Sequence, residues 1–285
     1  MNKNDILQRF IFDTVPVRGE IVRLKNSYRS IVDQHNYPDF IQKLLGEALV
    51  SISLLAAILK LKGRLTLQFQ GKGSLKLLLA QCNDQFHLRG LVQADENMTV
   101  EEMQTSFQQG TLMITMDLDI AKGQRYQGIV AWKGHSLSAS LENYFALSEQ
   151  LPTKIWLAVD EQQASGLLLQ VMPNKTPESF QDEWERLIHL TDTITEHELL
   201  TLDNADLLHK LYFEEDVRLF PTQPLQFKCE CSLKRSENAI LLLGQTDAEE
   251  ELKNKKNIVV TCEFCNHDYV FDAVDIALIF KNTML

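Results

Sequence analysis

Cys229-Glu230-Cys231 and, after thirty intervening residues, Cys262-Glu263-Phe264-Cys265 decide the fold of the last fifth of this chain. Four of the five cysteines lie in these two tight pairs. Two such pairs brought together make a tetrahedron of four sulfurs, which is the geometry of Zn²⁺ in a closed structural site. The sequence therefore predicts one zinc ion per chain, with Cys229, Cys231, Cys262 and Cys265 as its ligands.

The tail that carries these cysteines, residues 229–285, is too small to fold on hydrophobic burial alone. Its pattern predicts a helix over 236–243, two strands over 257–261 and 269–271, and a final apolar helix over 273–280. In units of this size the zinc-binding energy, about 10 kcal/mol, is also the folding energy. We therefore expect the tail to unfold if zinc leaves.

The preceding segment, residues 178–228, holds 12 acidic and 4 basic residues, a net −8 out of the −11 of the whole chain. It nevertheless has the pattern of short amphipathic helices, with a capping box at Thr195 and Glu198. Its apolar positions include Phe180, Trp184, Leu187, Leu207 and Leu211. Isolated helices this short are marginal in water, so we expect a linker that folds only on a docking surface. A permanently folded acidic connector is the alternative.

Residues 1–177 mix strands and helices without strict alternation, which is typical of an α+β core. Pro38 fits the first turn of a helix that runs to about Leu61 and should be central to that core, because its apolar face is wide. The expected organisation is thus an N-terminal mixed α/β-sheet core domain (1–177), a helical acidic linker (178–228) and a small C-terminal zinc-binding domain (229–285), in one interpretation a redox-switch domain.

Composition excludes several classes of function. A net charge of −11 argues against a protein that relies on attraction to nucleic-acid phosphates. The most apolar stretch, Ala48 to Leu59, has twelve uncharged residues, whereas a membrane span needs about twenty. The N-terminus lacks the apolar run of a signal peptide, so we expect no membrane partner, a cytoplasmic location and reducing conditions for the cysteines.

No pattern for catalysis stands out. The sequence has neither the G-x-S-x-G nor the H-E-x-x-H motif. A zinc held by four thiolates also has no open position for substrate, so we expect that the protein is not an enzyme. Cys82 follows an apolar strand and should be a buried, inert thiol. His267 is a weaker candidate ligand beside the four sulfurs, and His189, His197 and His209 are expected on the surface.

Three interpretations of the cysteines remain open on the residues alone. The zinc could be a permanent staple, or it could shape a nucleic-acid-binding ribbon, supported only by Lys234-Arg235 and Lys253, Lys255 and Lys256. In a redox switch, oxidants would attack the zinc-bound thiolates and eject the metal, and each cysteine pair is close enough to bridge internally. A thiol oxidoreductase is disfavoured because zinc would cap the thiols and a thioredoxin-like context is missing.

Longer motifs make the third interpretation the strongest. The whole chain resembles the family of redox-regulated 33 kDa heat-shock chaperonins (heat shock protein 33), and all four cysteine positions match the family's zinc motif. The matching segments are Arg9-Phe-Ile-Phe-Asp, Val17-Arg-Gly-Glu-Ile-Val-Arg-Leu, Gly63-Arg-Leu-Thr-Leu-Gln-Phe-Gln-Gly, Tyr144-Phe-Ala-Leu-Ser-Glu-Gln-Leu-Pro-Thr, Gly166-Leu-Leu-Leu-Gln-Val-Met-Pro, Phe227-Lys-Cys-Glu-Cys-Ser and Cys262-Glu-Phe-Cys-Asn.

The resemblance implies a cytoplasmic, ATP-independent holdase that binds unfolding proteins under oxidative stress. It implies that the reduced, zinc-bound form is inactive, and that oxidation forms Cys229–Cys231 and Cys262–Cys265 disulfides, releases zinc, unfolds the linker and yields a homodimer. From the apolar pattern, and not from the resemblance, we take Phe180, Trp184, Leu187, Leu207 and Leu211 as the linker's candidate client-binding residues.

Overall fold

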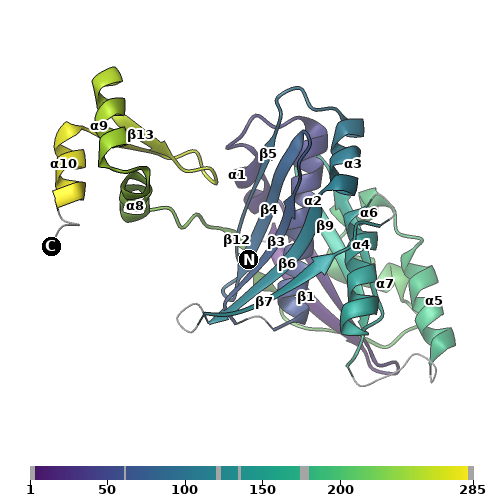
Figure 1. Ribbon diagram of the computed structural model, residues 1–285. Helices are drawn as coiled ribbons and strands as arrows, with labels where there is room; N and C mark the ends of the chain where they lie inside the picture. Colours follow the sequence, from purple (N-terminus) through teal and green to yellow (C-terminus); the bar gives the residue numbers. More distant parts are fainter. Residues whose placement is uncertain (1–3, 61, 120–122, 134–135, 174–179, 282–285) are drawn as a thin grey trace. The chain divides into compact units, whose positions relative to one another are not determined.

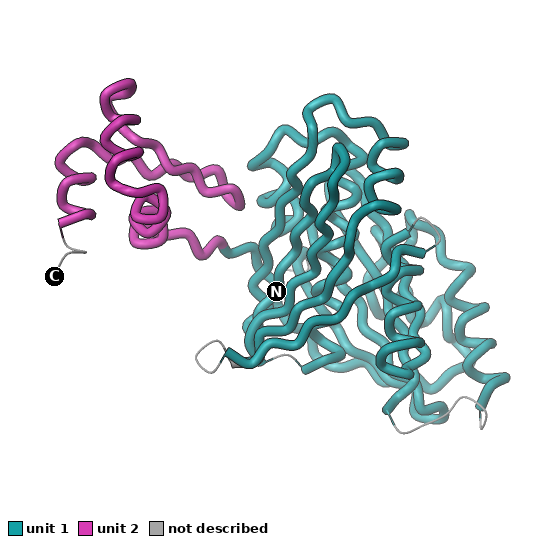
Figure 2. Tube along the Cα trace, viewed as in Figure 1, with its two compact units in different colours: residues 1–228 teal, residues 229–285 magenta. Residues whose placement is uncertain are grey.

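A computed structural model describes residues 4–60, 62–119, 123–133, 136–173 and 180–281. The chain folds into two units, residues 1–228 and 229–285, which Figure 2 shows in different colours. The fold is α+β, as predicted. The expected boundary between core and linker, at residues 177 and 178, lies outside the described residues.

The first unit contains two six-stranded sheets. One has the order β10-β1-β2-β9-β8, with β11 also paired to β1; its strands are β1 (Asp5–Phe12), β2 (Val17–Leu24), β8 (Thr153–Val159), β9 (Ala164–Val171), β10 (Val217–Leu219) and β11 (Gln223–Pro224). The other has the order β12-β5-β4-β3-β6-β7, with β3 (Arg64–Gln70), β4 (Leu75–Asn83), β5 (His87–Ala94), β6 (Thr111–Asp119), β7 (Gln124–Val130) and β12 (Gln226–Phe227).

Helix α2 (Asp39–Ile58) is central to this unit, as the sequence predicted. It packs against β2, β8 and β9 of the first sheet and against β3, β4 and β5 of the second. A helix covered on two sides must be apolar almost all round, which explains why 15 of its 20 residues are buried. Among the described residues it is also the one helix apolar and long enough to span a membrane, but 83% of that window is buried inside the protein.

Helices α3 and α4 of the core begin at local capping signals in the sequence. Helix α3 (Val100–Gln109) begins with a capping box between Thr99 and Glu102. Helix α4 (Leu137–Tyr144) starts at Ser136, whose side chain accepts a hydrogen bond from the amide of Ala139, and it continues as the π-helix η1 (Phe145–Glu149). The short helix α1 (Asn26–Val32) was not predicted.

The acidic segment forms three helices, α5 (Gln181–Thr191), α6 (Glu196–Thr201) and α7 (Asn204–Leu211). Figure 1 shows them gathered along one side of the first unit. Every residue of β9 is buried, because α2 covers one face of the first sheet and the linker helices cover the other. The predicted capping box at Thr195 and Glu198 is present.

The second unit consists of α8 (Leu233–Leu243), α9 (Gln245–Asn254), the hairpin β13 (Ile258–Thr261) and β14 (Asp268–Phe271), and α10 (Ala273–Lys281). The sequence predicted these elements except α9. Within residues 229–281, the core of the unit has five buried residues, Ile240, Ala248, Ile258, Phe271 and Ile276. So small a core agrees with the expectation that this unit needs a staple.

Candidate metal centre and linker interface

The four predicted cysteines come together in the second unit. The sulfur atoms of Cys229 and Cys262 are 3.6 Å apart, and so are those of Cys231 and Cys265. All four sulfurs lie within 4.8 Å of one another. A tetrahedral zinc with bonds of about 2.3 Å places its sulfurs about 3.8 Å apart, so the cluster has the size and the donor chemistry of a metal site.

Local backbone geometry explains how the second pair is presented. The hairpin β13–β14 ends in a tight turn in which the amide of Cys262 donates to the carbonyl of His267 at 2.9 Å. The amide of Asn266 donates back to the carbonyl of Cys262 at 2.8 Å, and Asn266 takes a left-handed conformation with φ of 48°. Both Cys262 and Cys265 therefore project from one turn.

Hydrogen-bond donors of the protein contact the sulfurs directly. The amide of Cys231 donates to the sulfur of Cys229 at 3.4 Å, and the hydroxyl of Tyr269 donates to the sulfur of Cys231 at 3.3 Å. Such donors stabilise thiolate charge and orient the ligands around a metal. Tyr269 was not identified from the sequence, because its role depends on the pairing of β14 with β13.

The cluster is accessible to oxidants, whereas the fifth cysteine is not. The four clustered residues are half-buried, while Cys82 on β4 is completely buried. Burial, with a smaller contribution from Asp84, raises the pKa of the Cys82 thiol to about 12. Cys82 therefore stays protonated and unreactive, as the sequence indicated.

The five candidate client-binding residues, which all belong to the linker, are buried. They belong to a single apolar cluster with residues on the outer face of the first sheet. We call this surface of the sheet the covered face; its buried residues are Phe10, Phe12, Val15, Val17, Ile21, Ala158, Leu167, Leu169 and Val171. The linker helices therefore shield both the covered face and their own apolar residues from water.

Aromatic residues from both partners pack at the centre of this interface. The ring of Tyr212, which follows α7, meets Phe12 edge-on with centroids 5.0 Å apart. Phe10 lies across Gly19 of the neighbouring strand, where a Cβ atom would come within 2.0 Å of the ring. The hydroxyl of Tyr212 is 2.5 Å from that of Thr191, so the buried phenol has a partner inside the linker.

Polar contacts also hold the linker on the sheet. Arg23 of β2 donates to the side chain of Asn204 at 2.6 Å and to the carbonyl of Leu200 at 2.9 Å. The indole of Trp156 donates to Asp192 at 2.9 Å, at the end of α5. Sequence reasoning missed these residues, since periodicity shows which face of a helix is apolar but not which distant side chain it meets.

The last part of the linker adds strands to both sheets. β10 and β11 pair with β1, and β12 pairs in parallel with β5. The amide of Lys228 donates to the carbonyl of Leu88 at 3.0 Å. Strand β12 ends at Phe227 and Cys229 follows Lys228 directly, so one residue separates this strand of the first unit from the first sulfur ligand.

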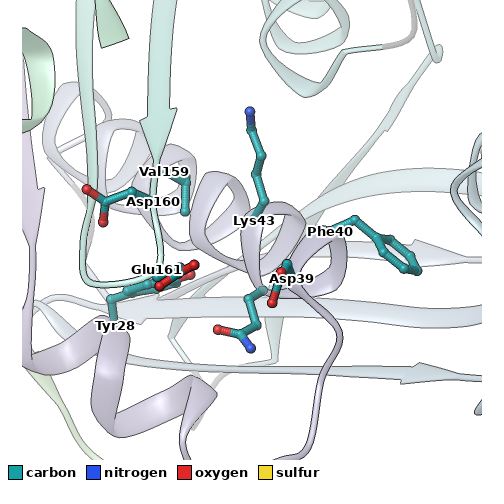
Figure 3. Close-up of a pocket in the computed structure, with 8 residues that line it drawn as sticks. Tyr28, Asp39, Phe40, Lys43, Val159, Asp160 and Glu161 are labelled. Atoms are coloured by element: carbon teal, nitrogen blue, oxygen red, sulfur yellow. The ribbon is translucent and has the colours of Figure 1, made fainter. Parts of the chain in front are cut away.

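A separate pocket of about 260 Å³ lies where α2 meets the loop after β8. Figure 3 shows Asp39, Lys43, Glu161 and Tyr28 among the residues that line it. The ammonium of Lys43 also lies 3.9 Å from the carboxylate of Glu196 on α6. The pocket thus borders a contact between the core and the linker.

The fold and the site together define a two-unit protein, in which an α+β core unit is followed by a small unit with four clustered cysteines. The sequence profile of the Hsp33 protein family matches residues 5–272. The 33 kDa chaperonin of Ectopseudomonas mendocina is 47% identical, over 97% of this chain and 95% of the relative. The 33 kDa chaperonin of Azotobacter vinelandii is 44% identical, over 98% of this chain and 96% of the relative.

The chain belongs to the Hsp33 family, a family of chaperones and not a class of enzymes. A crystal structure of the 33 kDa chaperonin from Thermotoga maritima shares the fold, with a TM-score of 0.82 over 99% of both chains and 24% identity.

Proposed function

We propose that this protein is a redox-regulated, ATP-independent holdase of the cytoplasm that binds unfolding proteins under oxidative stress. The observation that carries the proposal is the burial of the linker's apolar residues on the covered face, in a segment that runs directly into the four-cysteine cluster. The apolar surface suited to binding unfolded chains is present but shielded, which is the arrangement expected of an inactive resting state.

In the reduced protein, Cys229, Cys231, Cys262 and Cys265 would hold one Zn²⁺ as four thiolates. The half-buried cluster, with its sulfurs within 4.8 Å of one another, supports this ligand set. Zinc would supply folding energy to the second unit, whose own core has five buried residues among those that the structure describes. The hydrogen bonds from Tyr269 and from the amide of Cys231 orient the sulfur atoms and stabilise their negative charge.

Oxidation would remove that staple. Each pair of thiolates gives two electrons to one molecule of hydrogen peroxide, which takes up two protons and leaves as two waters while a disulfide forms. We propose Cys229–Cys231 and Cys262–Cys265 as the disulfides. The crossed pairs, Cys229 with Cys262 and Cys231 with Cys265, have sulfurs 3.6 Å apart, so peptide mapping of oxidised protein has to separate the two patterns.

Unfolding of the second unit would release the C-terminal end of the linker. Helices α5 to α7 are short and carry many like charges, so they depend on the covered face for stability. When they detach, the covered face and the side chains of Phe180, Trp184, Leu187, Leu207 and Leu211 become available to clients. Exposed apolar area of this kind also favours a homodimer of the oxidised form.

The proposal is tested by treating reduced, zinc-loaded protein with hypochlorous acid or with peroxide and mild heat. We expect release of about one zinc per chain, together with suppression of aggregation of a heat-unfolded client. Cys262→Ser in the full chain serves as the matched variant, because it removes one ligand and one disulfide partner. Oxidised wild-type protein that keeps its zinc and stays inactive would refute the switch.

A further inference from the structure

Strand β1 is covered along most of its outer edge by two short strands from the linker. β10 pairs with β1 at Phe10 and Phe12, and β11 pairs with it at Ile6 and Leu7. The other edge of β1 is paired with β2 from Asp5 to Ile11. When residues 180–228 detach, β1 therefore becomes the edge strand of a sheet.

The covering strands are held by backbone hydrogen bonds, and Val217 and Leu219 of β10 also pack against the apolar cluster of the covered face. The amide of Phe220 donates to the carbonyl of Arg9 at 2.9 Å, and the amide of Asp13 donates to the carbonyl of Asp216 at 2.9 Å. The side chains of β10 and β11 are exposed or half-buried. The edge of β1 thus takes up an extended chain through backbone hydrogen bonds, with alternate side chains packed on the covered face, as in recognition by strand addition.

We propose that the opened edge of β1 binds clients by taking up an extended segment of unfolded polypeptide as an added strand. The inference rests on the proposed function, since it requires the linker to detach. Unfolded chains carry unpaired amides and carbonyls whatever their sequence, and an edge strand offers the matching groups. A holdase with this edge can bind many clients by their backbones.

The edge of β1 offers an added strand apolar surface as well as backbone hydrogen-bonding groups. Phe10 and Phe12 of β1 point to that face, and Val17 and Ile21 of β2 continue it across the sheet. Side chains alternate along a strand, so every second residue of an added segment lies over this apolar surface. The expected ligand is therefore an extended segment with alternating apolar residues and free backbone groups.

One substitution removes an outward backbone group with little other change. The carbonyl of Arg9 and the amide of Asp13 form hydrogen bonds with the linker. Backbone groups alternate between the two edges of a strand, so the amide of Ile11 also faces the linker strand β10. Ile11→Pro deletes that amide, which lies opposite β10 while the linker is docked and belongs to the edge of the sheet once the linker has detached, where proline is tolerated. Ile11→Ala keeps the amide and shortens the half-buried side chain, which makes it the matched control.

The test uses oxidised full-length protein and two fluorescent peptides of alternating valine and threonine, flanked by lysines. One peptide is unmodified and the other is N-methylated at every second residue, so that one of its edges cannot donate hydrogen bonds. We expect the unmodified peptide to bind at least about tenfold more tightly. Ile11→Pro should weaken its binding about fivefold relative to Ile11→Ala.

Zinc release and proteolysis at residues 180–228 are measured on the same samples. Equal affinity for both peptides after the linker has opened would overturn the inference and leave the proposed function intact. A linker that stays protected after oxidation would overturn both. Amide hydrogen exchange along β1 completes the test. The outward amides of β1 should lose protection on oxidation and regain it when peptide is added. If they are already protected in the oxidised protein without peptide, a second copy of the chain fills the edge and the inference is overturned.

Discussion

The guanidinium of Arg23 on β2 donates through Nε to the side-chain oxygen of Asn204 on α7 at 2.6 Å. The two residues are 181 positions apart in the sequence, and their bond joins the core sheet to the linker. Burial lowers the pKa of Arg23 to about 10, so the group stays charged at neutral pH. The contact is thus a charge-assisted hydrogen bond in a half-buried site.

Replacing Arg23 with methionine should loosen the linker in the reduced protein. The loss of two hydrogen bonds, to Asn204 and to the carbonyl of Leu200, should cost about 2 kcal/mol of docking free energy. We expect proteolysis within residues 180–228 to become at least about tenfold faster. Arg29→Met on α1 is the control, since Arg29 bonds to Asp33 and to the carbonyl of Glu161. Equal proteolysis of both variants would contradict the role of Arg23.

Leu187→Ala should lower the amount of oxidant needed for activation. Leu187 of α5 is completely buried in the apolar cluster that α5 forms with the covered face, and its truncation should cost about 3 kcal/mol. Leu55→Ala makes a comparable cavity in the other core cluster and serves as the control. The dose of hypochlorous acid that gives half-maximal client protection is the measurement. A shift shared by both variants would show that the linker has no separate stability.

Tyr269→Phe should make the cysteine cluster more reactive. The phenol donates to the sulfur of Cys231, and its removal leaves that sulfur more nucleophilic and less well held. We expect zinc release by peroxide to be about fivefold faster, which corresponds to one hydrogen bond of about 1 kcal/mol. Tyr126→Phe, on the exposed strand β7, is the control. Unchanged or slower release in Tyr269→Phe would refute the assignment.

Glu47 on α2 should make the reduced protein less stable as pH rises. Burial raises the pKa of Glu47 from its ordinary value near 4.5 to about 7; Lys43 opposes the shift and Glu196 of the linker adds to it. The folded protein therefore binds this proton more tightly than the unfolded chain does. The stability contributed by protonated Glu47 is present below about pH 4.5 and is lost as pH rises to about 7.

Glu47→Gln should remove this dependence and stabilise the reduced protein at pH 8 by about 2 kcal/mol. Urea unfolding between pH 5 and pH 8 checks the prediction, with Glu101→Gln on the exposed side of α3 as control. A variant as pH-sensitive as the wild-type protein would exclude Glu47 as the cause.

The sequence predicted the elements that carry a local signal. Helix α2 was predicted because a long apolar run after Pro38 has few other structures available to it. The capping box at Thr195 and the two cysteine pairs are equally local, since their chemistry lies within a few residues. The buried position of Trp184 and Leu207 followed from the need of short amphipathic helices for a partner surface.

The partner surface itself could not be predicted from these patterns. Strands β10, β11 and β12 are only two or three residues long and form because β1 and β5 offer free edges, which no local pattern encodes. The bond from Arg23 to Asn204 depends in the same way on tertiary packing. Helix α9 was missed because its sequence is mostly polar, with Ala248 its one buried residue.

The central claim is that loss of zinc releases the linker. Amide hydrogen exchange measured with zinc release during oxidation of the full chain tests it most directly. We predict that protection in α5, α6 and α7 falls in step with release of about one zinc per chain, while α2 keeps its protection. Linker helices that remain protected after the zinc has left would contradict the account.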